Sequence, residues 1–208
     1  MSQVENAARS HGAKGLRTRA RILESAEEIF GRHGFHDAAV SQITRAAGLA
    51  QGSFYLYFPS KQAIFEELIR TRGRELHSSL SEAALAHEDR VEAEAAAIRR
   101  YFAWIAEHRW LYRVVRLAEF VAPELREDWY RGFAEGYALA IRRAMDSGQL
   151  EPGDPELTAW AVMGICDSIA MRTIVWGGEP AIAPAALEEV VRIALRALGA
   201  RAPDASRP

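Results

Sequence analysis

The sequence predicts an all-α protein in which a three-helix N-terminal domain precedes a longer helical C-terminal domain. Apolar residues recur every three to four positions along most of the chain, which is typical of amphipathic helices, and no segment shows the alternation of a strand. Glycine and proline fall where one helical pattern ends and the next begins. With 208 residues, 49% hydrophobic and 26% charged, the chain has the length and composition of a globular protein of one or two domains.

The first helix follows a polar, basic segment, residues 1–14, which predicts a flexible arm. From Leu16 the apolar side chains lie on one helical face, and we expect the helix to end between Gly31 and Gly34. Two histidines, His33 and His36, stand near this helix end. Two imidazoles with no thiolate and no fixed third ligand are a weak metal motif, so we predict an ordinary helix end and no metal site.

The segment Val40–Phe58 predicts two short helices joined by a tight turn. Val40 and Ile43 begin a helical pattern that Gly48 closes, because glycine tolerates a left-handed backbone. Aromatic residues at Phe54 and Phe58 resume the pattern, so a second helix begins within a few residues of the first. Two short helices joined in this way predict a helix-turn-helix, whose second helix enters the major groove of DNA.

This segment resembles the DNA-binding domain of TetR-family transcriptional regulators. The resemblance covers roughly residues 16–64 and rests on Ala47-Gly48-Leu49, on the run QGSFYLYF that starts at Gln51, and on Lys61. It implies a DNA-binding domain over residues 15–72, a homodimer, and palindromic double-stranded operator DNA as the partner. The family usually carries Thr or Ser just before the first helix of the motif, where this chain has Ala39-Val40 and its first hydroxyl at Ser41.

The distribution of charge agrees with a nucleic-acid partner. The net charge is −2, but residues 1–76 contain 11 Lys/Arg and 8 Asp/Glu, whereas the remainder contains 15 and 20. The basic half is therefore the half with the motif. Residues 6–23 include five cations and no acid, as neutralising a phosphate backbone requires.

The expected DNA contacts lie at the tip of the second helix and on its flanks. Gln51 and Ser53 offer polar groups for base edges, and Gly52 lets the backbone approach the DNA. The tyrosines combine a ring with a hydroxyl that can bond phosphate, whereas we expect the two phenylalanines to pack in the core. The cations near residue 18 either contact phosphate or stay solvated. The full set is Arg17, Thr18, Arg19, Ser41, Gln51, Gly52, Ser53, Tyr55, Tyr57 and Lys61.

The C-terminal helices are bounded by capping residues and prolines. Ser60 caps a helix from Lys61 to about residue 87, so the domain boundary near residue 72 falls inside a helix. Asp89, Asp154 and three prolines predict the later starts, giving helices over roughly residues 89–105, 108–122, 123–148, 154–176 and 184–199. The resemblance implies that residues 73–200 bind a ligand and form a dimer, and residues 201–208 predict a disordered tail.

Large aromatic residues and arginines are frequent in the C-terminal part. Most of the aromatics are ordinary core, but the family holds its inducer between these helices. The run Glu119–Glu124, with Met163-Gly164 and Met171-Arg172, resembles the branch that answers fatty acyl-CoA, whose chain needs an apolar tunnel and whose phosphates need arginines. Other hydrophobic ligands stay open. The expected pocket comprises Trp104, Trp110, Arg113, Leu117, Phe120, Trp129, Phe133, Tyr137, Met163, Asp167 and Arg172.

The last two helices have broad apolar faces, which predict pairing across a two-fold axis. One recognition helix contacts few base pairs, so a dimer is needed for specificity. We therefore expect a homodimeric repressor that leaves its operator when ligand fills the C-terminal domain. The expected interface residues are Trp160, Ile165, Ile169, Leu187, Val191 and Leu198.

Other classes of protein find less support. A single cysteine, Cys166, permits no internal disulfide. The sequence contains no nucleophile with a neighbouring histidine and acid, and no glycine-rich phosphate loop. It therefore gives no indication of an enzyme or of a bound cofactor. No apolar run reaches the ~18 residues of a membrane span and the N-terminus lacks a secretory signal, so we expect a cytoplasmic protein without a membrane partner. The alternative is an all-helical protein that binds an acyl group or another small molecule, or an enzyme, without acting on DNA.

Overall fold

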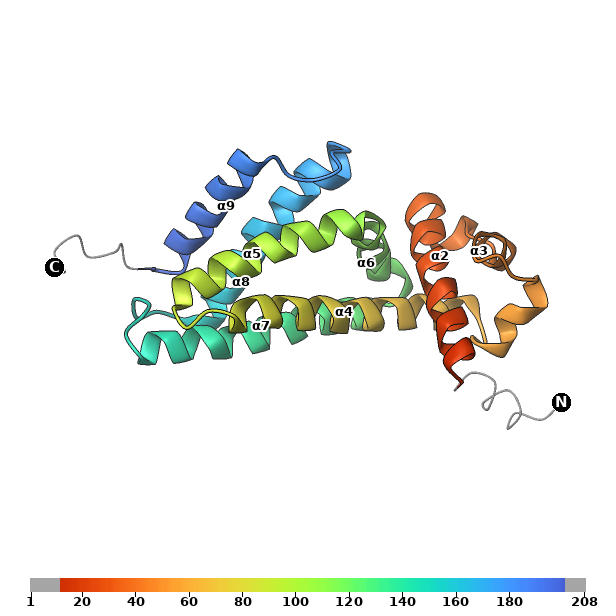
Figure 1. Cartoon of the computed structure of the whole chain (residues 1–208), viewed down its shortest axis with the longest axis horizontal. Helices are drawn as coiled ribbons and strands as arrows, with labels where there is room; N and C mark the ends of the chain where they lie inside the picture. The colour runs from red at the N-terminus through yellow and green to blue at the C-terminus, as the bar shows by residue number, and fades with distance from the viewer. Residues whose placement is uncertain (1–11, 201–208) are drawn as a thin grey trace. The chain divides into compact units, whose positions relative to one another are not determined.

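The computed structural model describes residues 12–200, which are helical along most of their length (Figure 1). The predicted all-α fold is confirmed: the described residues contain no strand, only one isolated bridge between Leu150 and Ala200. The chain forms two compact units. Of the described residues, the first unit contains those up to Gly73 together with Trp110–Arg126, and the second contains Arg74–Arg109 and those from Glu127 to Ala200. Most of the predicted arm and all of the predicted tail lie outside the described residues.

The first unit begins with α2 (Ala13–Asp37), α3 (Val40–Ala46), the 3₁₀ helix η1 (Gln51–Leu56) and the start of α4 (Lys61–Leu85). In Figure 1, α3 lies next to α2. Gly34 and Gly48 have positive φ angles of 79° and 64°, so the backbone turns at the two glycines where left-handed residues are needed. The predicted second helix of the motif is a 3₁₀ helix, a tighter and shorter form than an α-helix.

Aromatic packing holds these helices together. Phe30 of α2 and Phe65 of α4 meet edge to face with ring centroids 5.4 Å apart, and Phe35 lies 5.1 Å from Phe65. Phe54 of η1 and Ile43 of α3 are fully buried. Each short helix therefore contributes its apolar side to one core, and tertiary packing supplies the stability that such short helices lack alone.

Helix α6 (Arg109–Val121) packs with the first unit from Trp110 onward, although the sequence assigned residues 73–200 to one C-terminal domain. The physical reason is close packing at Gly31 of α2. A Cβ atom at Gly31 would lie 2.7 Å from the Cβ of Trp110, so only glycine permits this approach. Arg32, the next residue on α2, lies over the Trp110 ring at 5.3 Å.

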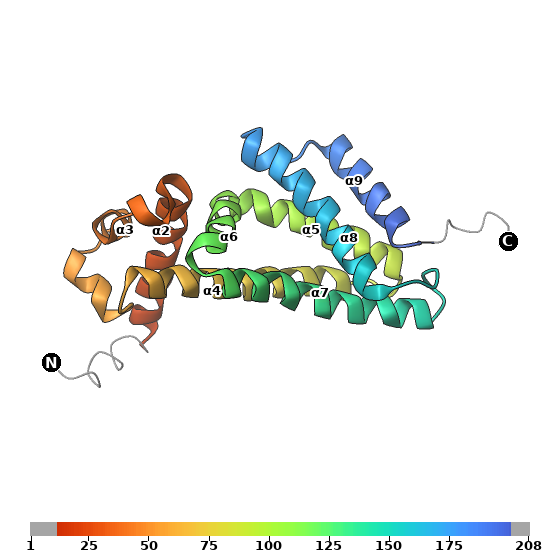
Figure 2. The same cartoon turned by 180° about the vertical axis from the view of Figure 1, so that it is seen from behind.

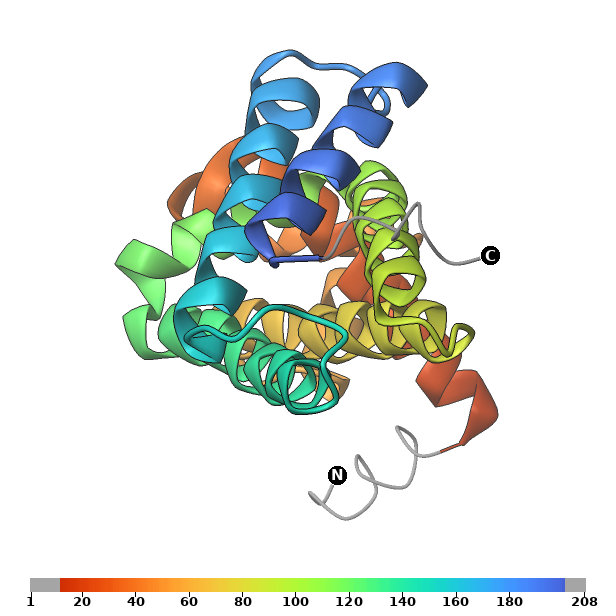
Figure 3. The ribbon, with the colours of Figure 1, turned by 90° about the vertical axis from the view of Figure 1, so that its left-hand side faces the viewer.

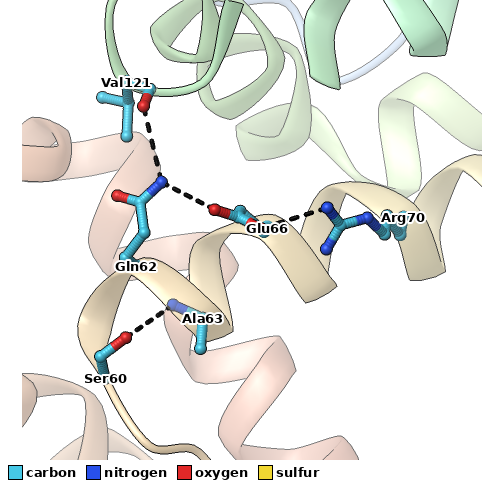
Figure 4. A network of polar contacts seen from close by, with 6 residues as sticks. All are labelled: Ser60, Gln62, Ala63, Glu66, Arg70 and Val121. Carbon is cyan, nitrogen blue, oxygen red and sulfur yellow. Dashed lines mark hydrogen bonds and ion pairs between the residues drawn. The ribbon is translucent and has the colours of Figure 1, made fainter. Parts of the chain in front are cut away.

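The other end of α6 is fastened to α4. Gln62 donates from its amide to Glu66 Oε1 at 3.0 Å and to the backbone carbonyl of Val121 at 3.5 Å (Figure 4). Arg70 in turn donates to Glu66 at 3.1 Å, and Ser60 Oγ caps α4 by accepting from Ala63 N at 3.0 Å. Helix α6 is thus joined to α2 at its start and to α4 at its end.

The second unit contains the rest of α4, with α5 (Arg90–Glu107), α8 (Pro155–Ala170) and α9 (Pro184–Ala197). It also contains α7 (Pro123–Asp146) from Glu127 onward. Two predicted caps are confirmed: Asp89 accepts from Glu92 N at 2.9 Å, and Asp154 accepts from the amides at residues 156 and 157. Helices α8 and α9 lie side by side, with α5 packed against both (Figures 2 and 3).

The predicted helix to Trp176 changes its winding near the end. After Ala170 it continues as a π-helix, η2 (Met171–Trp176), which is a rare conformation. A Cβ atom at Gly177 would lie 2.6 Å from the carbonyl oxygen of Thr173, so glycine is required where this helix closes.

By length and composition alone, one described helix, Pro155–Trp176, is apolar enough to cross a bilayer. The sequence shows no uninterrupted apolar run there, because Glu156, Asp167 and Arg172 divide it. Only 28% of its most apolar window is buried within the chain, so this helix presents apolar surface to solvent in a single chain.

Candidate nucleic-acid interface and effector unit

The helix-turn-helix separates a buried face from an exposed one. Phe54 and Phe58 are buried, as predicted, while Gln51 and Gly52 are exposed and Ser53 is half-buried. Tyr55 is 56% exposed, and its ring packs edge to face on Phe54 at 5.3 Å. The rings of the core therefore hold η1 in place while its polar groups face outward. Tyr57 is half-buried on the same segment.

The N-terminal end of α3 is organised by side chains of its own first turn. The Gln42 side chain accepts a hydrogen bond from Ala39 N at 2.8 Å, which is half of a capping box. The other half needs a side-chain oxygen at the N-cap, and alanine has none. Ser41 is half-buried. The hydroxyl of the buried Thr44 donates to the carbonyl of Val40 at 3.1 Å, so this threonine serves the helix itself.

The predicted phosphate contacts on α2 differ in their surroundings. Arg17 is exposed on the helix, whereas Thr18 donates its hydroxyl to the carbonyl of Lys14 at 2.9 Å. Arg19 lies 3.3 Å from Glu67 of α4 and over the Phe58 ring at 4.8 Å. Its guanidinium is therefore already engaged within the first unit, and Arg17 is the better placed of the two arginines to meet DNA.

Lys61 is placed differently from the expectation. Its Nζ donates to three backbone carbonyls at the end of α2, instead of pointing out from the start of α4. No pattern in the sequence signals this arrangement, because the acceptors lie more than 20 positions away along the chain.

The residues expected to line a ligand pocket divide between the units. Trp110, Arg113, Leu117 and Phe120 lie on α6 in the first unit, and Phe120 is 82% exposed. The others lie in the second unit, namely Trp104, Trp129, Phe133, Tyr137, Met163, Asp167 and Arg172. Their division follows from the packing of α6 on α2 and α4 described above.

Within the second unit several of these residues pack in pairs. Trp104 is buried and packs at a tilt against the His108 ring with ring centroids 4.2 Å apart, which makes it a core residue. Trp129 and Phe133 of α7 pack at 5.4 Å, and His77 of α4 lies 5.9 Å from Phe133. Arg172 is exposed on the π-helix.

A buried polar cluster in this unit escapes the sequence analysis. Glu94 of α5 is buried, accepts from Arg90 NH2 at 2.5 Å and also accepts from the hydroxyl of Tyr137 on α7. Burial raises the pKa of Glu94, while the neighbouring Arg90 opposes that shift. Burial and the charge of Glu94 also raise the pKa of Tyr137. The only available signal was an acid in an otherwise apolar stretch, Ala93 to Ala97.

Cys166 of α8 lies near this cluster. Burial, with the charges of Glu94 and Asp167, raises the pKa of its thiol to about 12. A thiol with such a pKa stays protonated at neutral pH, and Cys166 packs as a buried core residue. Among residues 12–200 there is also no group of three His, Cys, Asp or Glu that could hold a metal ion.

The predicted interface residues fall into two sets. Trp160 of α8 is 42% exposed and Leu157 nearby is 68% exposed, so these side chains are available to a partner. Val191 and Leu198 of α9 are buried inside the second unit, which corrects their assignment to the dimer interface. Helix α9 packs against α5 and α8, so its buried apolar stripe belongs to the core of its own chain. Ile165, Ile169 and Leu187 are half-buried.

Comparisons with known proteins agree with this architecture. A model of the bacterial regulatory proteins of the TetR family matches residues 22–68, and a model of the C-terminal domain of AefR-like transcriptional repressors matches residues 95–201. The HTH-type transcriptional regulator YdgC of Bacillus subtilis is 32% identical over 169 residues, which cover 79% of this chain and 85% of that protein. The fatty acid metabolism regulator protein of Bacillus subtilis is 26% identical over 151 residues, covering 70% and 78%.

Solved structures share the fold. The fatty acid degradation regulator FadR from Bacillus halodurans superposes with a TM-score of 0.75 at 21% identity and covers 88% of this chain and 95% of its own. FadR from Bacillus subtilis, solved in complex with stearoyl-CoA, superposes with a TM-score of 0.71 at 22% identity and covers 86% and 97%. At these identities the likeness establishes the arrangement of helices.

Proposed function

Because the chain belongs to the TetR family and is a DNA-binding transcriptional regulator of that type, we propose that it is a homodimeric repressor released from palindromic operator DNA by a hydrophobic effector. The proposal rests on the helix-turn-helix, which has one buried face and one exposed face. Buried Phe54 and Phe58 fix the segment, and exposed Gln51, Gly52 and Tyr55 remain free to meet a duplex. A rigid segment with polar groups outward is what base recognition in a major groove requires.

Base and phosphate contacts follow from this exposure. Gln51 and Ser53 suit base edges, because an amide and a hydroxyl can each donate and accept. Tyr55 and Tyr57, with Arg17, Thr18 and Ser41, suit phosphates, which position the protein without reading sequence. We propose that the protein makes these contacts with DNA in the cytoplasm of a bacterial cell.

The exposed apolar surface of the second unit supports the homodimer. Leu157 and Trp160 on α8 and Ile193 on α9 are all at least 42% exposed, and α8 and α9 lie side by side. Two copies of such a pair pack as a four-helix bundle about a two-fold axis, which buries the apolar surface of both chains. The same axis presents two recognition segments to the two halves of a palindrome.

An acyl-CoA thioester is the effector class that the relatives favour. Two of the proteins compared above are named as regulators of fatty acid metabolism or degradation, and one structure contains stearoyl-CoA. The second unit offers aromatic and aliphatic surface for a chain, and Arg172 is an exposed cation for a phosphate.

Release follows from the way the units are built. Helix α4 begins beside η1 and continues past Gly73, and α6 is fixed to α2 and α4. A ligand that binds one arrangement of the helices more tightly than another shifts the population toward that arrangement. The spacing of the two recognition segments then changes. No step of this mechanism needs a covalent reaction, so the proposed function includes no catalysis.

The decisive experiment measures binding to the DNA upstream of the protein's own gene. We expect salt-dependent, sequence-specific binding, and we expect the triple variant with Gln51, Ser53 and Tyr55 changed to Ala to lose at least about 100-fold in affinity, since each base contact contributes about 1–3 kcal/mol. The matched control changes Glu127 and Arg131, an exposed ion pair on α7, to Ala. Unchanged affinity of the triple variant would refute the assigned DNA surface.

The effector is tested on the same complex. Native mass spectrometry of the purified protein identifies any ligand that it retains, and stearoyl-CoA, free stearate and free CoA are then added separately to the operator complex. We expect release by the thioester and not by its two parts. Release by stearate alone would assign a fatty acid, and no release by any of the three would exclude stearoyl-CoA as the effector.

A further inference from the structure

The ammonium group of Lys61 is fully occupied inside the first unit. Its Nζ donates to the carbonyls of Phe35 at 2.8 Å, His36 at 3.1 Å and Ala38 at 2.9 Å. A lysine ammonium has three hydrogens and therefore three donors. All three are directed at protein oxygens, so no donor remains for a DNA phosphate.

The acceptors explain why a cation belongs at this position. The last carbonyls of an α-helix have no partner within the helix, and they form the negative end of its dipole. Helix α2 ends at Asp37 after the turn at Gly34, and Lys61 satisfies carbonyls on both sides of that end. The ammonium also lies 4.7 Å from the centroid of the Phe35 ring, which adds a cation–π contact.

The segment that Lys61 holds leads directly into the helix-turn-helix. Ala38 is buried and Ala39 is the N-cap of α3, so the bonds to residues 35–38 determine where α3 begins. Lys61 itself is the first residue of α4, five positions after the end of η1. The Lys61 side chain therefore connects the residues just before α3 with the residues just after η1.

We infer that Lys61 is a positioning residue that sets the geometry of α3 and η1 for base recognition, and that it is not a phosphate contact. This inference rests on the proposed DNA binding. Losing the three bonds lets the turn at residues 34–38 move relative to α4, which misplaces the base-contacting residues. Because the ammonium does not neutralise a phosphate, the number of counterions released on binding stays the same.

Two substitutions separate the two roles. Lys61→Met removes the charge, and Lys61→Arg keeps it, but a planar guanidinium cannot direct three hydrogens at three convergent carbonyls. We expect both variants to lose at least about tenfold in affinity for the operator, with unchanged affinity for non-specific DNA and an unchanged slope of log K against log salt. Binding is measured well below the unfolding temperature of each variant, so that only folded protein is compared.

A phosphate contact gives the opposite pattern. Lys61→Met would then reduce the salt slope by roughly 1 and weaken specific and non-specific binding alike, and Lys61→Arg would restore both. Equal affinity of all three proteins for the operator would also overturn the inference. Arg17→Met is the matched control for loss of an exposed cation from the same unit.

The wild-type protein offers a test that does not depend on any variant. The chain contains two lysines, Lys14 and Lys61, so acylation by acetic anhydride followed by mass spectrometry reports on each separately. We expect exposed Lys14 to react readily and Lys61 to be protected equally with and without operator DNA. A Lys61 that reacts like Lys14 in the free protein and becomes protected only on DNA would contradict the inference. The reactivity of Lys61 in the free protein can be measured even if no operator binding is found. Failure of this inference is therefore distinguishable from failure of the proposed function.

Discussion

At the scale of single residues, Glu94 is a buried carboxyl whose pKa is raised by burial. It lies among alanines on the buried face of α5, and its carboxylate is held by Arg90 and the Tyr137 hydroxyl. Removing a carboxylate from water favours its neutral form, which raises its pKa in the folded protein. Folding therefore increases the proton affinity of Glu94, and the stability of the fold depends on pH through this residue.

Glu94→Gln should remove that dependence. Because the folded pKa is raised above the ordinary value of 4.5, the stability that Glu94 contributes is complete below that value and declines as pH rises through the folded pKa. Lowering the pH from about 7.5 to 5 should thus increase the free energy of unfolding of wild type relative to E94Q. Urea unfolding of both proteins across this range measures the difference.

Glu188 provides a control with the opposite sign. Its hydrogen bonds with Arg99, at 2.8 and 2.7 Å, lower the pKa of this exposed carboxyl. Its contribution is therefore lost only as the pH falls below the ordinary value, so wild type and Glu188→Gln should keep a constant difference between about pH 7.5 and 5. If E94Q behaves as E188Q does, the shift assigned to burial is wrong.

At the scale of elements, the helix boundaries were predictable where the cause is local. Asp89 and Asp154 cap α5 and α8 with their own side chains, and a cap needs only the next three residues. The association of α6 with the first unit was not predictable, since an apolar stripe defines a face and not its partner. For the same reason, the sequence could not show that Val191 and Leu198, which were assigned to the dimer interface, are buried within their own chain.

The candidate site divides in the same way. Burial of Phe54 and Phe58 and exposure of Gln51 follow from helical spacing within one short segment. The bonds of Lys61 and the Glu94–Tyr137 contact join residues from distant parts of the chain, and such contacts depend on tertiary packing that periodicity does not encode.

The junction of α2 and α6 at Gly31 leads to a prediction about stability. In Gly31→Ala the new Cβ would lie 2.7 Å from the Cβ of Trp110, which cannot rotate away because it is attached to the backbone. We expect the two helices to separate slightly, at a cost of about 1–3 kcal/mol in the free energy of unfolding. Urea unfolding at neutral pH measures this cost.

Gly132 is the matched control for that substitution. It lies within α7 and a Cβ there would meet nothing within 4 Å. Gly132→Ala should therefore stabilise the protein by up to about 1 kcal/mol, because alanine favours the helix. Equal effects of the two substitutions would show that the approach of α6 to α2 is not tight.

At the scale of the whole molecule, the exposed apolar side chains of α8 and α9 support the proposed pairing with a second copy. Leu157 and Trp160 remain exposed at 68% and 42% in a single chain, and Tyr130 of α7 stacks beside Trp160 at 6.3 Å. Exposed apolar side chains grouped in this way are typical of a protein–protein interface. In the proposed dimer the same surface also determines the spacing of the two recognition segments.

If the proposed dimer forms through this surface, charged substitutions there should yield a monomer. In Leu157→Glu with Trp160→Glu, two unpaired carboxylates per chain would have to be buried on association, so the folded chain should elute as a monomer in size-exclusion chromatography with light scattering. Operator affinity should fall by at least about 100-fold, because a monomer contacts one half-site only. Leu85→Glu, at an 84% exposed leucine at the end of α4, introduces a similar charge elsewhere and should leave both measurements unchanged. A double variant that remains a dimer and binds the operator as wild type does would place the interface on another surface of the molecule.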